Sequence, residues 1–420
     1  MTEEIEERLP LELKALIVAE LAARGDRASI VAFSLTQRAM VNLCQKYLFQ
    51  DIELASFALV RRLLLILRES PTLAQHIRAL HFFEHTGGDT KWWIYADGNV
   101  SDILAVVPNL LHLALVTAFD IPHDKFPPAL AEGLHGVLPS LRTLRLINVH
   151  RVPVSLFNRM KSIRGLRISY TTFAPPEDWA QIRASTAPTQ LAHLHVDETL
   201  LSGTWFERLI DPSSRFPLSV RGLHTLCIEC PHDGRTDQVD RLLSNAADTL
   251  HALEINMGQC YEIEPPFVTL ERMRALKVLI LSDIPYVARD NWARVALSVP
   301  SLDHLVIHFD ESDWSRGITE MFSRLFGPNS TLKLVTVHLD YDSYLEGDYQ
   351  LKDALCKHYH SPAYDGRKVV VAEVSDVVPP VDGCCRILLY KEREYEGRMA
   401  GWDSLLSRYV SSASYARDIV

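Results

Sequence analysis

One short apolar pattern recurs ten times along this chain and constrains its fold more than any other feature. In each copy an apolar residue is followed by a second three positions later and by a third five positions later. The copies are Ile77-Leu80-Phe82, Leu110-Leu113-Leu115, Leu141-Leu144-Leu146, Ile163-Leu166-Ile168, Leu191-Leu194-Val196, Leu223-Leu226-Ile228, Leu250-Leu253-Ile255, Leu276-Leu279-Leu281, Leu302-Leu305-Ile307 and Leu332-Val335-Val337. Their first positions are 22 to 33 residues apart, so one structural unit is repeated along most of the chain.

The spacing within each copy predicts a β-strand. The second and third apolar residues lie two positions apart, so on a strand both point to the same side. Segments between the copies have helical spacing, namely Ser56–Ser70, Asp237–Ala247, Ala288–Val299 and Ser315–Phe326. One strand and one helix cannot bury their own apolar sides, but stacked units build a parallel sheet inside and helices outside. We therefore expect an α/β fold. An all-helical array containing these triplets is the alternative, because short apolar runs do not separate helix from strand.

The repeats resemble a leucine-rich-repeat array over about residues 73–345. The resemblance implies a curved solenoid with parallel strands on its concave face and helices outside. That family usually has Asn or Cys three residues after the third Leu, where the side chain bonds to neighbouring turns. Here those positions are His85, Ala118, Val149, Thr171, Thr199, Pro231, Gly258, Ile284, Asp310 and Asp340. We therefore expect an irregular solenoid without this ladder of bonds.

The first fifty residues have a helical rhythm instead. Pro10 suits the first turn of a helix, because the N–H that it lacks would have no partner there. Leu13, Ile17 and Leu21 follow at four-residue steps and predict one apolar stripe. Asp26, after Gly25, can cap a second helix. Met40, Leu43, Leu48 and Phe49 form a third apolar set. Three short helices are therefore expected.

This N-terminal region resembles an F-box, in the order Leu9, Pro10, Glu12, Leu13, Ile17, Leu21 and Asp26. Leu35 to Met40 and then Tyr47-Leu48-Phe49 resemble the later part of the motif, with Met40 where Trp is usual. F-box proteins join a Skp-type adaptor, and through it a cullin ubiquitin ligase, to a substrate held by the C-terminal module. The resemblance implies that Leu9, Pro10, Leu13, Ile17 and Leu35 belong to the adaptor contact or to the helices that support it.

The resemblance implies three regions: an F-box domain at 1–55, a repeat solenoid at 56–345 and a C-terminal capping region at 346–420. The chain would then be the substrate-recognition subunit of an SCF-type E3 ubiquitin ligase. In the capping region, Lys368–Val374 and Arg386–Tyr390 are expected to be strands. The alternative is a stand-alone interaction scaffold whose first fifty residues only cap the solenoid. A weaker alternative is an enzyme whose site lies in a loop such as Glu84–Val100.

A substrate is expected on the concave face, where the residues flanking the core pair of each strand point. Six polar residues are candidates for this contact: Arg145, Arg167, His193, His195, Glu229 and Glu254. Guanidinium groups pair bidentately with carboxylates and phosphates. Arg145 and Arg167 therefore predict recognition of an acidic or phosphorylated protein segment.

Composition and the absence of known motifs exclude several classes of function. The 420 residues contain 43 Lys and Arg against 53 Asp and Glu, a formal net charge of −10, which argues against a nucleic-acid or polybasic membrane binder. Glu3, Glu4, Glu6 and Glu7 stand where a secretory signal would need a basic start, so a cytoplasmic or nuclear location is expected. There is no phosphate-binding loop, His-Glu-x-x-His or nucleophile elbow. We expect no enzyme activity, no cofactor and no metal; Cys227-x-x-Cys230 lacks the second pair of ligands that structural zinc needs.

Overall fold

The computed structural model describes residues 9–84, 93–96, 98–117, 126–174, 188–197, 201, 203–211, 213–214, 216–229, 237–257, 267–282, 284, 289–309, 325, 332, 334–339 and 368–373. The chain divides into two compact units. Unit 1 comprises Met1–Ile163 and Thr171–Ile182, and unit 2 comprises Arg164–Tyr170 and Arg183–Val420. The division lies within the segment 56–345, for which the sequence predicts a single array.

Unit 1 begins with three helices: α1 (Leu11–Ala23), α2 (Arg27–Ser34) and α3 (Arg38–Leu48). Asp26 caps α2, because its carboxylate accepts a hydrogen bond from the Ser29 N–H at 3.0 Å. The three helices share a small core of Val18, Ile30, Met40 and Cys44, packed against partly buried neighbours such as Leu21 and Phe33. Met40, which stands where the F-box pattern usually has Trp, is fully buried. The three predicted N-terminal helices are confirmed.

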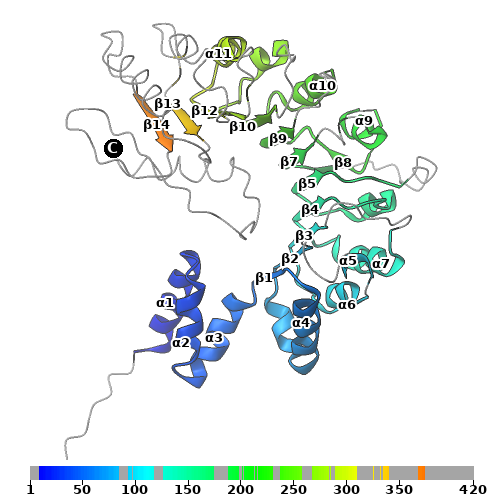
Figure 1. Ribbon diagram of the computed structural model, residues 1–420, viewed down its shortest axis with the longest axis vertical. Helices are drawn as coiled ribbons and strands as arrows, with labels where there is room; N and C mark the ends of the chain where they lie inside the picture. The colour runs from blue at the N-terminus through cyan, green and yellow to red at the C-terminus, as the bar shows by residue number, and fades with distance from the viewer. Residues whose placement is uncertain are drawn as a thin grey trace, which may run out of the picture. The chain divides into compact units, whose positions relative to one another are not determined.

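A parallel sheet follows in unit 1. Its strand order is β1 (Asp51–Leu54), β2 (Ala79–Phe83), β3 (His112–Val116) and β4 (Thr143–Ile147). Between the strands lie α4 (Phe57–Glu69), the 3₁₀ helix η1 (Pro71–His76), α5 (Trp93–Ala96), α6 (Asn99–Val106) and α7 (Pro128–Val137). Figure 1 shows α4, α6 and α7 along one side of the strands. After β4 comes a second 3₁₀ helix, η2 (Val154–Arg159).

Unit 2 repeats this plan. Its sheet is parallel, in the order β5 (Gly165–Ser169), β7 (His193–Val196), β9 (Thr225–Glu229), β10 (Ala252–Asn256), β11 (Val278–Ser282), β12 (His304–Phe309), β13 (Leu334–Leu339) and β14 (Lys368–Glu373). Its helices are α9 (Thr204–Ile210), α10 (Asp237–Ala246), α11 (Arg289–Ser298) and the 3₁₀ helix η4 (Phe267–Arg272). A second small sheet pairs β6 (Thr189–Gln190) with β8 (Leu218–Ser219).

The apolar triplets have the role that their spacing predicts. The second and third residues of each copy lie on strands β2, β3, β4, β5, β7 and β9 to β13, and neighbouring copies are in register, as Leu226 with Leu253 and Leu253 with Leu279. In the first nine copies all three residues are at most 2% exposed. The α/β class with a parallel sheet is confirmed, and the all-helical alternative is wrong.

Three of the four predicted helices are confirmed within about one residue as α4, α10 and α11, while Ser315–Phe326 lies outside the described residues except for position 325. The predicted strand at Lys368–Val374 is confirmed as β14, which pairs with β13. The predicted strand at Arg386–Tyr390, like the rest of the predicted capping region, lies outside them.

The expected absence of side-chain bonds between turns is wrong in unit 1. Asn148, one position before the one that the family pattern uses, donates from Nδ2 to the Thr117 carbonyl at 3.2 Å. Thr117 in turn donates its hydroxyl to the Asn148 carbonyl. The Thr171 hydroxyl donates to the Leu146 carbonyl at 3.2 Å. Asn148 has a φ of 59°, a left-handed conformation that Asn tolerates better than most residues. The bonds are therefore present, shifted by one residue or carried by Thr.

Candidate protein-docking site

The first helix has more apolar surface than its core can cover. Val18 is fully buried on α1, and Leu21 and Ala22 pack against the core on the same side. Leu13, Leu16 and Ile17 point away from Val18 and are exposed. A helix whose apolar residues occupy two faces can bury only one of them in a three-helix core. Leu13, Ile17 and Leu21 lie along one side of α1 as their spacing predicts, but of the three only Leu21 packs against the core, while Leu13 and Ile17 are exposed.

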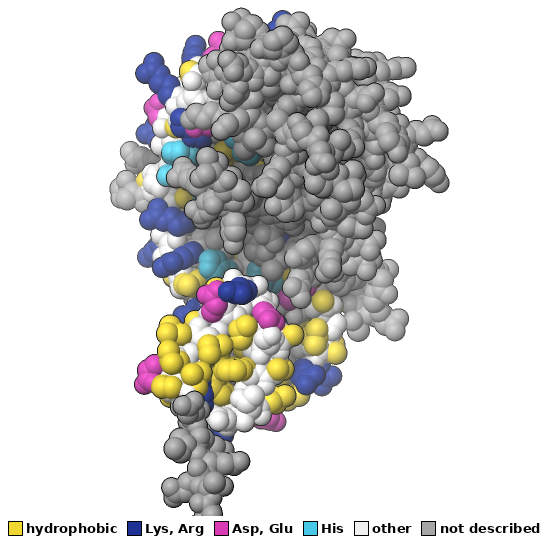
Figure 2. All heavy atoms as spheres, turned by 90° about the vertical axis from the view of Figure 1, so that its left-hand side faces the viewer, with side chains coloured by type: hydrophobic (Ala, Val, Ile, Leu, Met, Phe, Trp, Pro, Cys, Tyr) yellow, Lys and Arg dark blue, Asp and Glu magenta, His cyan; other side chains and the backbone are white. Residues whose placement is uncertain are grey.

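The exposed apolar side chains are concentrated in this region. Of the eleven large apolar side chains that are exposed among the described residues, seven lie between positions 9 and 35. They are 40% to 82% exposed, with Leu35 the most exposed, and together we call them the helical apolar face: Leu9, Leu11, Leu13, Leu16, Ile17, Val31 and Leu35. Figure 2 shows the hydrophobic side chains of these helices gathered on the surface toward the viewer. Single exposed apolar residues are ordinary, but a cluster marks an interaction site.

Every residue predicted to bind the adaptor is on this surface. Leu9, Leu13, Ile17 and Leu35 belong to the helical apolar face, and Pro10, beside Leu9, is exposed as well. Three members were not predicted: Leu11, Leu16, which is the second most exposed at 65%, and Val31. Leu16 could have been found from its spacing, three residues after Leu13 on the same helix. Val31 could have been found in the same way, because it lies four residues before Leu35 and so one helical turn away.

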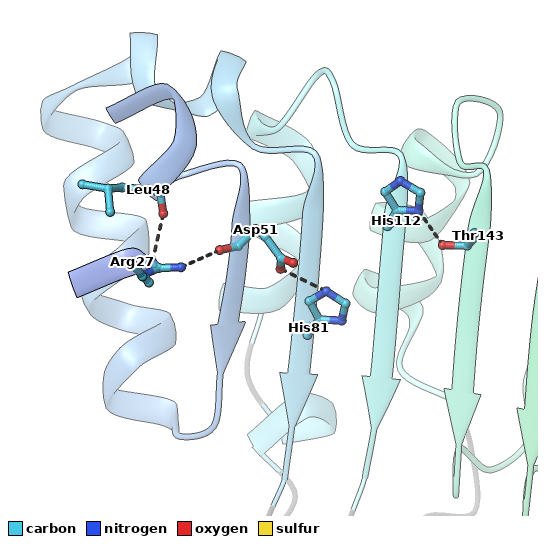
Figure 3. Close-up of polar contacts among 6 residues, drawn as sticks. All are labelled: Arg27, Leu48, Asp51, His81, His112 and Thr143. Carbon is cyan, nitrogen blue, oxygen red and sulfur yellow. Dashed lines mark hydrogen bonds and ion pairs between the residues drawn. The ribbon is translucent and has the colours of Figure 1, made fainter. Parts of the chain in front are cut away.

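Polar contacts hold the helices that carry this face. The Lys14 ammonium donates to the Gln37 side-chain carbonyl at 2.8 Å, joining the start of α1 to the start of α3. Arg27, in the first turn of α2, donates to the Leu48 carbonyl at 2.9 Å and to the Asp51 carbonyl at 3.2 Å. Leu48 ends α3 and Asp51 begins β1. Arg27 therefore joins α2 to the first strand of the sheet (Figure 3).

Asp51 extends this link into the sheet. Its carboxylate lies 3.1 Å from Nε2 of His81 on β2, and the His81 side chain is nearly buried. Figure 3 shows that the Asp51 carbonyl contacts Arg27 and the Asp51 carboxylate contacts His81. One strand further, Nδ1 of His112 lies 2.7 Å from the Thr143 hydroxyl. Burial lowers the pKa of His112, and the neighbouring His81 lowers it further. The helices are thus bonded to the sheet through side chains that were not predicted from the sequence.

The predicted substrate residues lie on the sheet face opposite the leucine core. In unit 2, Arg167, His195 and Glu254 occupy one cross-strand row, in which Cys227 stands between His195 and Glu254. Nε2 of His195 lies 3.2 Å from the Glu229 carboxylate. His193, two positions before His195, contacts the Thr225 hydroxyl through Nδ1. The structure therefore brings five of the six predicted residues onto one face of unit 2.

These side chains are largely buried. His195 and Glu254 are each 6% exposed, and His193, Arg167 and Glu229 are partly buried. Further along the same face, Ala252, Ile280 and Val306 form a buried apolar cluster. Arg145, the sixth predicted residue, is on β4 of unit 1 and is 8% exposed.

Charges around Glu229 keep it ionised. Burial raises the pKa of the Glu229 carboxyl, but the hydrogen bond from His195, the charges of His195 and Arg167 and a hydrogen bond from the Tyr170 side chain outweigh it, so the pKa is lowered. Burial, reinforced by Glu254, raises the pKa of the Cys227 thiol well above its usual value. A protonated thiol is a poor nucleophile. Cys227 is therefore not activated for covalent chemistry.

Within the described residues, no group of three or more His, Cys, Asp or Glu side chains is placed to hold a metal ion. Cys230, the second cysteine of the Cys227-x-x-Cys230 pair, lies outside them. Among the helices described, none is both long enough and apolar enough to cross a membrane. A comparison with models of protein families found no match. A comparison with curated proteins found no similar sequence.

Proposed function

We propose that this protein is the substrate-recognition subunit of an SCF-type (cullin) E3 ubiquitin ligase. It binds a Skp-type adaptor through the helical apolar face and a protein substrate through the strand repeats. It carries out no chemistry of its own and works by holding a bound protein close to the ubiquitin-charged enzyme. We also propose that the parallel strands with their outer helices form an irregular leucine-rich-repeat solenoid.

The observation that carries the proposal is the exposure of Leu9, Pro10, Leu13, Ile17 and Leu35, all in the helical region. The F-box resemblance selects these five positions from sequence order alone, and four of them would otherwise be expected in a core. Removing such side chains from water on binding contributes roughly 25 cal/mol per Å² of apolar surface. Covering the helical apolar face with an adaptor would therefore contribute favourably to the free energy of binding, because this surface remains exposed to water in the folded chain.

The arrangement of the repeats supports the second half of the proposal. Strands separated by 22 to 33 residues of chain pair in parallel and bury their triplets on one side. Such units present a row of side chains from successive strands on the other side. In unit 2 this row includes Arg167, His195 and Glu254, together with the nearby Glu229. A mixed row of this kind suits a protein segment that carries both charged and polar groups.

Co-purification of the full chain with a purified Skp-type adaptor tests the proposal. Changing Leu9 and Pro10 to Ala should abolish co-purification and leave the helical circular dichroism signal unchanged, because both side chains are exposed and outside the helical core. The matched control is Leu59→Ala with Leu65→Ala on α4, which are 42% and 56% exposed but outside the helical apolar face. Retained binding by the Leu9 and Pro10 variant would reject the F-box assignment.

One observation favours a second function, a stand-alone repeat scaffold with a helical cap. Arg27 bonds α2 to the carbonyl groups of Leu48 and Asp51, beside β1 at the end of the sheet of unit 1. Helices that cover the open edge of a sheet prevent its pairing with other chains. A cap needs no exposed apolar face, however, so seven exposed apolar residues favour the adaptor. Absence of adaptor binding by the unaltered chain would leave the scaffold as the better account.

A further inference from the structure

The sheet of unit 2 has a regular line of residues at the edge where its strands begin. Before each of the five strands β7 and β9 to β12, the preceding residue donates its backbone N–H to the equivalent carbonyl of the preceding repeat. The first residue of each strand donates to the same carbonyl. The N–H groups of His224 and Thr225 both bond to Ala192, those of His251 and Ala252 to His224, and those of Lys277 and Val278 to His251. Successive repeats therefore place equivalent side chains side by side along this edge.

Six residues lie on this line, and Ala192 and Asp303 are the two without a basic side chain. Arg164, His224, His251 and Lys277 occupy line positions, and Arg221 and Arg274 lie three residues before two of them. These six basic residues are all exposed, and we call them the edge row. Within residues 164–282 of the described part of this edge, Asp248 is the acidic residue at a position equivalent to Arg221 and Arg274. Asp303 follows on the next strand, where its carboxylate lies 3.8 Å from the Lys277 ammonium.

The two histidines at the centre of the row have fixed orientations. Nδ1 of His224 lies 2.8 Å from the Gly222 carbonyl, and Nδ1 of His251 lies 2.7 Å from the Thr249 carbonyl. A carbonyl only accepts, so each Nδ1 carries a proton, and Nε2 donates to an acidic partner in the cationic form of the ring. The two rings are stacked, with centroids 5.3 Å apart. The row is therefore an ordered surface at its centre.

The length of the row fits an extended peptide. Neighbouring strands lie about 4.8 Å apart, so the four intervals from β5 to β11 carry the row over roughly 19 Å. An extended segment rises about 3.3 Å per residue, so about six residues span this distance. A duplex nucleic acid would offer phosphates far beyond the row, and the net charge of −10 opposes a long polyanion.

We propose that the edge row binds an extended acidic segment, about six residues long, of a partner protein. This surface differs from the sheet face proposed for substrate and from the helical apolar face, and its binding does not depend on the adaptor. Exposed basic side chains at strand spacing would meet Asp, Glu or phosphorylated side chains through charge-assisted hydrogen bonds.

Fluorescence anisotropy of labelled octaglutamate with the full chain, without adaptor, tests this proposal. Charge reversal of Arg221→Glu with Lys277→Glu should weaken binding at least tenfold. The matched control, Arg241→Glu with Arg294→Glu, makes the same change of net charge at exposed positions on α10 and α11 of the same unit, and should change binding less than twofold. Arg164→Glu alone, on a different repeat, should weaken it at least threefold, so the test does not depend on one variant.

Three results would overturn the proposal. The first is the absence of saturable binding of octaglutamate by the unaltered chain. The second is an equal loss in the edge-row variant and the control, which would mean that total charge, not this surface, controls binding. The third is tighter binding of an eight-nucleotide oligothymidylate, or of vesicles containing phosphatidylserine, with the same dependence on Arg221 and Lys277, which would assign the row to another class of partner.

Discussion

Leucine has opposite roles in the two parts of this chain. In the repeats, the triplet residues of the first nine copies are at most 2% exposed, and Leu226, Leu253 and Leu279 lie side by side in the core of unit 2. In the N-terminal helices, Leu13, Leu16 and Leu35 are 46%, 65% and 82% exposed. The repeats use apolar surface to fold, whereas the helices keep an apolar surface after folding. Surface of the second kind contributes nothing to the free energy of folding and is available for association.

The largest expected effect on the free energy of unfolding comes from making the same Leu→Ala substitution in each of the two parts. Leu253→Ala should lower the free energy of unfolding by about 2–5 kcal/mol, because it removes buried methyl groups and leaves a cavity. Leu35→Ala, the same chemical change at an exposed position, should change it by less than about 0.5 kcal/mol. Urea unfolding of the full chain followed by circular dichroism measures both. Similar losses in the two variants would mean that Leu35 is part of the folded core.

A smaller effect tests whether the polar face of unit 2 also stabilises the fold. Glu229→Gln should lower the free energy of unfolding at pH 7 by about 1 kcal/mol, since a charged hydrogen bond to His195 becomes a neutral one. The Glu229 pKa is lowered in the folded protein, so ionisation stabilises the fold above the ordinary value of 4.5 and this contribution is lost as the pH falls through the folded pKa.

The pH dependence supplies the control for that measurement. The difference in melting temperature between the unaltered chain and Glu229→Gln should be constant from pH 7 down to about pH 5 and should shrink below the ordinary Glu pKa of 4.5. A difference that does not shrink below that pH would show that Glu229 does not stabilise the fold through its charge.

The smallest effect concerns the link between the two kinds of region. Arg27→Ala removes the donors to the Leu48 and Asp51 carbonyls and should cost about 0.5 kcal/mol, at the low end for a hydrogen bond because Arg27 is exposed. Amide hydrogen exchange should become faster in β1, next to the lost contact. Arg24→Ala, which removes only the exposed pair with Glu20, is the control. Equal exchange in β1 of both variants would mean that Arg27 does not hold the helices to the sheet.

The strands and their register were predictable because each triplet imposes a period of two on a repeat of about 28 residues, and Leu226 and Leu253 are in register as that pattern requires. Strand β1 was not predicted, although Phe49, Ile52 and Leu54 have the spacing of a triplet, because Phe49 also fits the apolar set of the third N-terminal helix. The orientation of α1 was not predictable from periodicity, because Leu13 and Val18 lie on different faces and both are apolar. Sequence order through the F-box resemblance, rather than hydrophobicity, identified Leu9 and Leu35.

The polar face shows the opposite limit. Residue alternation places Arg167, His195 and Glu254 on the side away from the leucine core, and the register confirms that placement. Their burial, and the contact between His195 and Glu229 over 34 positions, depend on which strands are neighbours and on what packs over them. Neither the burial nor this contact can be predicted from the sequence of one strand alone.

The most direct test of the account is the affinity of the full chain for a purified Skp-type adaptor, measured by titration calorimetry. Leu16→Ala with Leu35→Ala should weaken binding at least a hundredfold, since a few buried apolar anchors supply most of the energy of such interfaces. Leu59→Ala with Leu65→Ala on α4 should leave the affinity within about twofold. Equal affinities for the two double variants, or no binding by the unaltered chain, would contradict the assignment of the helical apolar face to the adaptor.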